Sequence, residues 1–168
     1  MKQHKIHWWN IKHRVWAKVI CLAMYAILLA FVLHNDWDLF VLFLFVFGYI
    51  FVAIGIDNAH VPILNEAMKA LNIQCDPFPM LLDTEKLLNY KHNDANRLMI
   101  VINHCVGLRN VGRYTEAYKI LQENYCVYNP KIPTIHKIVY CNNMADICRL
   151  LGKVEGAQDY VDELRSLL

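Results

Sequence analysis

Two long apolar segments near the N-terminus constrain this chain more than any other feature. Residues 17–33 contain one charged side chain, Lys18 at their start, and residues 39–56 contain none. An α-helix rises about 1.5 Å per residue and the hydrocarbon core of a bilayer is about 30 Å thick, so each segment can cross it as a helix. Only five residues separate the two segments, which requires a tight turn. We therefore expect a two-span transmembrane hairpin over residues 17–56.

Basic residues are concentrated ahead of the first expected span. The first 18 residues carry five Lys and Arg and no acidic residue, whereas the turn carries Asp36 and Asp38. Basic residues that flank a span are retained on the cytoplasmic side. This predicts an integral protein of a plasma or inner membrane, with its tail (residues 1–16) and its C-terminal domain (residues 57–168) in the cytoplasm. A cleaved signal peptide is the rival explanation of the first segment, and it leaves the domain on the same side.

The charge distribution also bears on partners. A basic tail beside a bilayer gains about 1 kcal/mol per Lys or Arg from anionic lipid, so lipid contact is expected there. Residues from Asp57 onward hold 12 basic and 13 acidic side chains and no basic stripe. Nucleic acid is therefore not an expected partner.

Small residues lie on one face of each expected span. They are Ala23, Ala26 and Ala30 in the first and Gly48 and Gly55 in the second. Such faces allow helices to approach closely in lipid, either within the hairpin or between copies in an oligomer. Both alternatives remain open from the sequence. A channel or pump is disfavoured, because neither span carries an ionisable group in its interior that would mark an ion path.

The remaining residues predict an all-α domain. Apolar residues recur at helical spacing from Pro62 onward, and no segment alternates with a period of two for long. Residues 62–90 predict two helices with a break at Asp76-Pro77-Phe78-Pro79. The expected fold class is thus all-α: two transmembrane helices followed by a domain of antiparallel helix pairs.

An internal repeat organises the C-terminal part of this domain. Residues 108–117 align with residues 148–157 at a constant separation of 40, and the alignment superposes Gly112 on Gly152 and Ala117 on Ala157. Glycine ends a helix readily because a positive φ costs it little. Each unit, about residues 94–128 and 134–168, is therefore expected to be a helix, a glycine turn and a second helix.

These residues resemble the tetratricopeptide repeat family. The run Gly112-x-Tyr114-x-x-Ala117 is followed by Leu121 and, after the second helix, by Pro130, whereas the second unit has Val154 at the tyrosine position. The family period is 34, so a period of 40 places about six extra residues between the units. The resemblance implies that the leading helices line a concave groove that binds a peptide or another protein. The matching positions, with their polar neighbours, are Asn103, Arg109, Asn142, Asn143, Asp146 and Arg149.

The side chains at these positions suit peptide recognition. An asparagine both donates and accepts hydrogen bonds, as a peptide backbone does, and an arginine can bind a carboxylate through two parallel bonds. A structural explanation competes for the arginines. Arg109 and Arg149 each lie near the end of an expected helix, where the helix dipole favours a cation.

Catalytic and metal-binding motifs are absent from the sequence. The six cysteines form no Cys-x-x-Cys pair, and the histidines of the tail, His4, His7 and His13, are expected at the lipid interface rather than on a metal. We expect no cofactor and no enzymatic activity, so a membrane enzyme using a Cys or His ranks last. The favoured function is a membrane-anchored scaffold that binds a protein or peptide. The alternative is a small accessory or immunity-type membrane protein whose hairpin makes the specific contacts.

Overall fold

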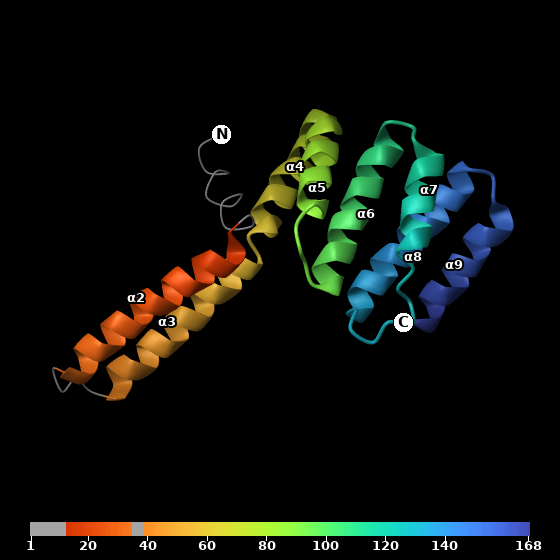
Figure 1. Ribbon diagram of the computed structural model, residues 1–168. Helices are drawn as coiled ribbons and strands as arrows, with labels where there is room; N and C mark the ends of the chain where they lie inside the picture. Colours follow the sequence, from red (N-terminus) through yellow and green to blue (C-terminus); the bar gives the residue numbers. More distant parts are fainter. Residues whose placement is uncertain (1–12, 35–38) are drawn as a thin grey trace. The chain divides into compact units, whose positions relative to one another are not determined.

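The computed structural model describes residues 13–34 and 39–168, and all regular secondary structure in this part of the chain is helical (Figure 1). The predicted all-α fold class is confirmed. Residues 1–12 of the expected tail and residues 35–38 of the expected turn lie outside the described residues. The chain divides after Ile63 into two compact units. The helices are α2 (Arg14–His34), α3 (Leu39–Asp57), α4 (His60–Gln74), α5 (Phe78–Leu88), α6 (Asp94–Asn110), α7 (Tyr114–Glu123), α8 (Thr134–Leu150) and α9 (Val154–Ser166).

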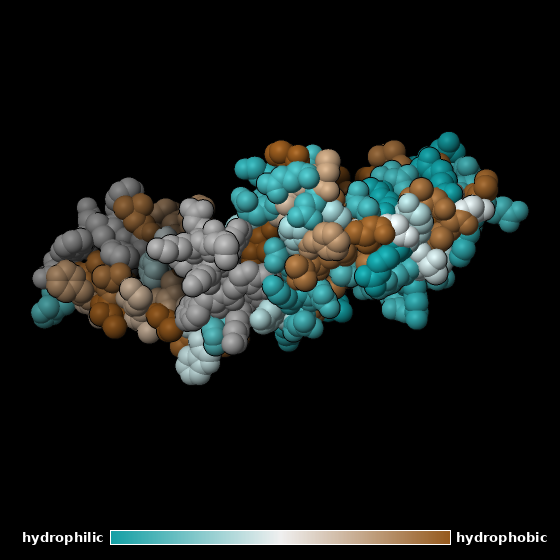
Figure 2. Space-filling model, turned by 90° about the horizontal axis from the view of Figure 1, so that it is seen from above, coloured by the Kyte–Doolittle hydropathy of each residue, from teal (hydrophilic) through white to brown (hydrophobic). Residues whose placement is uncertain are grey.

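Helices α2 and α3 form an antiparallel hairpin (Figure 1). Apolar residues surround α3 on all sides, as expected for a segment that is embedded in protein or membrane. Large apolar side chains of both helices are exposed, including Ile27, Phe31 and Phe51. Figure 2 shows much of the visible surface of these helices in brown, the colour of hydrophobic residues. The hairpin therefore has an apolar exterior.

An ion pair joins the two helices at the end where α2 begins and α3 finishes. The Nζ atom of Lys18 lies 2.7 Å from Oδ2 of Asp57. Both side chains are about 40 % exposed, at 36 % and 45 %, so solvent screening limits the contribution of the pair to less than about 1 kcal/mol. Its importance is positional, because it places Lys18 of α2 and Asp57 of α3 at the same end of the hairpin.

One helix in the described part of the chain is long and apolar enough to cross a membrane by itself. It is α2, over Val15–Val32. The end of α3 meets the same criterion only together with α4, as the bent pair Val46–Asp57 and His60–Gln74. Signal sequences share this composition and this position near the N-terminus. The structure thus supports one candidate span, and the expected second span is taken up below as part of the proposed function.

The small residues of the hairpin have different surroundings. A Cβ atom on Gly48 would lie 2.8 Å from the hydroxyl oxygen of Tyr25, whereas a Cβ on Gly55 would meet nothing within 4 Å. Gly48 therefore allows α2 and α3 to pack together. Ala23, Ala26 and Ala30 of α2 are exposed, as is Gly55.

The second unit begins within α4, at Leu64, and α5 follows it in the chain. Ala67 and Leu71 of α4 pack with Met80 of α5, and Val106 of α6 covers this small cluster. The break between the helices falls at residues 75–77, beside the predicted one. Cys75 adopts φ = 53°, a left-handed conformation that is uncommon for a residue with a Cβ atom.

The next four helices follow the 40-residue register of the sequence. Helices α6 and α8 begin and end at positions that differ by 40, and α7 and α9 begin with the same separation. Gly112 and Gly152 both have positive φ, 79° and 70°. Each glycine is part of the same C-terminal capping motif, in which the next residue's N–H donates to the carbonyl five residues before it, over 2.9 Å in both units. The repeat is therefore present in the backbone as well as in the sequence.

One hydrophobic core joins these four helices. Each helix packs against the next, and α6 also packs against α8. Tyr140 of α8 lies at the centre, fully buried, and its hydroxyl donates to the Leu121 carbonyl oxygen at 3.0 Å. Four of the six cysteines are buried, where they pack as small apolar residues. They are Cys105, Cys126, Cys141 and Cys148.

Candidate functional site

Asn103 and Asn143 occupy equivalent positions on α6 and α8. Both are buried, and each donates from Nδ2 to the backbone carbonyl four residues earlier, Met99 or Val139, at 2.8 Å. This bond fixes the amide against its own helix. The side-chain oxygen of each asparagine remains as an acceptor that a peptide N–H could use.

Arg109, Asp146 and Arg149 form a charged cluster across α6 and α8. Asp146 accepts from Nη1 of Arg109 at 3.3 Å and from Nη2 of Arg149 at 2.7 Å. Arg109 and Asp146 are about one-third exposed and Arg149 is 63 % exposed, so the cluster lies at the surface and carries a net charge of +1. Both arginines also lie in the last turns of their helices, where the dipole favours them. An incoming carboxylate would have to compete with Asp146.

The structure therefore brings together three of the six residues expected at the site. Asn103 and Asn143 are related by the repeat, while Asn142 is exposed on α8 beside Asn143. The sequence grouped Asp146 with the others as a neighbour and did not predict that it joins the two repeat units. That contact spans 37 residues, and no local pattern encodes it.

The repeat region also contains a concavity that was not expected from the sequence. It is a half-polar pocket of about 180 Å³ where the start of α6 faces the connection between α7 and α8. Its lining residues are Asp94, Arg97, Leu98, Asn124, Tyr125, Cys126, Asn129 and Ile132. The extra residues between the repeat units build one wall, which explains why helix patterns gave no signal for it.

His104 links α6 to α5 through a polar contact. Its Nδ1 atom lies 2.9 Å from Oγ1 of Thr84, whose hydroxyl donates to the Met80 carbonyl, so Nδ1 carries the hydrogen. Burial lowers the pKa of His104 below 6.5, and Arg113 acts in the same direction, whereas Glu85 and Glu116 oppose it. His104 is therefore neutral in the folded domain at pH 7.

This environment predicts a pH dependence of stability. Because the pKa of His104 is lower in the folded state, the unfolded chain binds a proton first as the pH falls through 6.5. The free energy of unfolding should decrease by at most about 1 kcal/mol between pH 7 and pH 5.5 through this residue. Urea titrations followed by circular dichroism, compared with His104→Gln, measure it. If the free energy of unfolding changed equally with pH in the two proteins, His104 would not contribute to the pH dependence.

The buried thiols are poor nucleophiles. Burial raises the pKa of Cys105 and of Cys141 to about 12 and that of Cys126 to about 11. The reactive form of cysteine is the thiolate, so these three residues stay protonated at neutral pH. Within residues 13–34 and 39–168, His, Cys, Asp and Glu also form no group of three that could hold a metal ion.

Comparison with protein-family models, curated proteins and solved structures finds no match to this chain. The class that the structure defines is an all-helical protein with one candidate membrane span and a helical-repeat-like arrangement of its remaining helices.

Proposed function

We propose that this protein is a membrane-anchored adaptor whose tetratricopeptide-like domain binds a protein or an extended peptide in the cytoplasm. The observation that carries the proposal is the repetition of one structural unit with polar side chains at matching positions of its leading helices. Those positions are Asn103 and Asn143, followed by Arg109 and Arg149.

The proposed anchor consists of both α2 and α3. The two helices have 21 and 19 residues, which correspond to about 30 Å each. Lys18 and Asp57 meet at one end of the hairpin, where a bilayer surface would accommodate their charges. This arrangement supports a topology with both termini on one side, and the five basic residues near the N-terminus favour the cytoplasmic side.

The proposed binding surface combines hydrogen-bond acceptors with a weak positive charge. The side-chain oxygens of Asn103 and Asn143 are suited to the N–H groups of an extended chain. The Arg109–Asp146–Arg149 cluster adds donors to one end of both leading helices. A partner with exposed carboxylates would fit this surface better than a basic one.

Crosslinking capture from native membranes tests this proposal. The full-length chain is compared with a variant carrying Asn103→Ala, Asn143→Ala and Arg149→Ala. We expect the variant to capture at least about tenfold less of one dominant partner, since several polar contacts of about 1 kcal/mol each are removed. Circular dichroism checks that the variant is folded.

A matched control carries three polar substitutions on α9, Gln158→Ala, Asp162→Ala and Arg165→Ala. These exposed side chains bond to one another and lie on α9, whereas the residues of the proposed binding surface lie on α6 and α8. Their loss should leave capture unchanged. Equal capture by all three proteins would refute the groove as the binding surface and would direct attention to the hairpin.

A further inference from the structure

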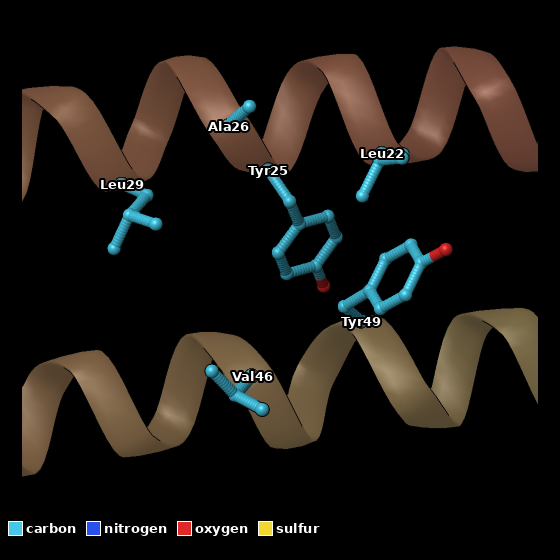
Figure 3. Close-up of a pocket in the computed structure, with 6 residues that line it drawn as sticks. All are labelled: Leu22, Tyr25, Ala26, Leu29, Val46 and Tyr49. Atoms are coloured by element: carbon cyan, nitrogen blue, oxygen red, sulfur yellow. The ribbon is translucent and has the colours of Figure 1, made fainter.

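The hairpin contains an apolar pocket of about 200 Å³ between α2 and α3 (Figure 3). Leu22, Tyr25, Ala26 and Leu29 of α2 line it, together with Val46 and Tyr49 of α3. Ala26 leaves space that a larger side chain would fill. The pocket opens on an exterior that is otherwise covered by large apolar side chains.

Two tyrosines meet in this pocket. Their ring centroids are 5.5 Å apart, and the rings cross at 69° (Figure 3). The Tyr25 hydroxyl points toward α3, where the absence of a side chain at Gly48 gives it room. The Tyr49 hydroxyl points the other way, toward the Leu22 side of the pocket. Among the described residues, no hydrogen-bond partner reaches it.

Tyr49 lies near the middle of α3, so the length of the helix gives the depth of its hydroxyl in a membrane. It lies ten residues from the start of α3 and eight from its end, which is about 12–15 Å from either helix terminus. If α3 spans the bilayer as in the proposed function, the hydroxyl lies near the midplane. Water is absent at that depth, and acyl chains there offer no hydrogen-bonding atom. A lipid tail would fill the pocket without satisfying the hydroxyl.

A second copy of the chain can both cover the pocket and provide a hydrogen-bond partner for the Tyr49 hydroxyl. A two-fold axis along the membrane normal keeps every residue at its own depth, so Tyr49 of one copy comes opposite Tyr49 of the other. A tyrosine hydroxyl both donates and accepts, and therefore two of them can bond to each other. The open space beside Ala26 allows the helices to approach closely, as small residues do in membrane interfaces.

We propose that the protein forms a homodimer within the membrane through the Tyr49 face of the α2–α3 hairpin. This inference rests on the two-span topology of the proposed function. It assigns the hairpin a defined partner and leaves the repeat domain of each copy available for its own ligand, so the dimer presents two such domains.

Energy transfer between labelled copies in phosphatidylcholine vesicles tests the dimer. The full-length chain carries a donor or an acceptor at its N-terminus, and the protein-to-lipid ratio is varied. We expect transfer above that of random proximity. Tyr49→Phe should weaken association roughly threefold to thirtyfold, the range found for hydrogen bonds between membrane helices. Ala26→Leu should weaken it at least as much, whereas Phe51→Leu, outside the pocket, should have no effect.

Protease protection of N- and C-terminal tags on the same vesicles separates the two proposals. Tags on the same side together with random-level transfer, or with equal transfer for Tyr49→Phe, would refute the dimer and leave the anchor intact. Tags on opposite sides would refute the two-span anchor and the dimer with it.

Discussion

Replacing Tyr140 by alanine should lower the free energy of unfolding of the repeat domain by about 3–5 kcal/mol. The Tyr140 side chain is fully buried, its hydroxyl bonds to the Leu121 carbonyl, and its ring contacts the edges of Tyr125 and Tyr160. Its removal leaves a cavity where α7, α8 and α9 meet. Such a loss is a large fraction of the total stability of a domain, which is about 5–15 kcal/mol.

Hydrogen–deuterium exchange of peptides from α6 to α9 measures this effect without interference from the hairpin. Tyr140→Phe should cost about 1 kcal/mol, since it removes one hydrogen bond and keeps the ring. Tyr128→Ala is the control, because Tyr128 is 82 % exposed. A cost for Tyr140→Ala no greater than that for Tyr128→Ala would contradict the central position of Tyr140.

Alanine at either repeat glycine should destabilise the domain by about 1–2 kcal/mol, since residues with a Cβ atom are disfavoured in the left-handed region. Gly112 and Gly152 have φ of 79° and 70°. The reverse change, Cys75→Gly, should stabilise the first helix pair by up to about 1 kcal/mol, because Cys75 already has φ = 53°. Denaturant titrations of the full-length variants give these differences.

Gly156→Ala is the matched control for this series. Gly156 lies within α9, has no positive φ, and an added Cβ would be 3.7 Å from the Cys148 sulfur, an ordinary contact. Alanine there should be neutral or stabilising by up to about 1 kcal/mol. If Gly112→Ala and Gly152→Ala behaved in the same way as Gly156→Ala, the capping geometry of the repeat would be wrong.

Local patterns were sufficient to predict most of the secondary structure. Helical spacing indicated the all-α class, and the repeated glycine indicated the turns at Gly112 and Gly152 with their register of 40. Both signals depend on residues close in sequence: apolar side chains three and four positions apart, and a backbone conformation that favours glycine. The membrane anchor was predicted from length and composition, and among the described residues α2 alone of the two expected spans meets those criteria by itself.

Contacts between distant residues could not be predicted in the same way. Lys18 and Asp57 are 39 positions apart, and Thr84 and His104 are 20 apart. Each pair depends on how two helices pack, and the spacing of apolar residues leaves the crossing position undetermined. The candidate site illustrates this limit. The repeat identified Arg109 and Arg149, whereas only the packing of α6 on α8 places Asp146 between them.

The alternation of helix pairs has a consequence for how the domain folds. Most contacts among α4 to α9 join helices that are neighbours in the chain, and the farthest regular partners, α6 and α8, are separated by one helix. Chains with such short-range contacts close only small loops and fold fast. Each pair can therefore form on the one before it, in the order of synthesis. Helix α9 packs mainly against α8, so it is expected to join the domain after α8 has formed.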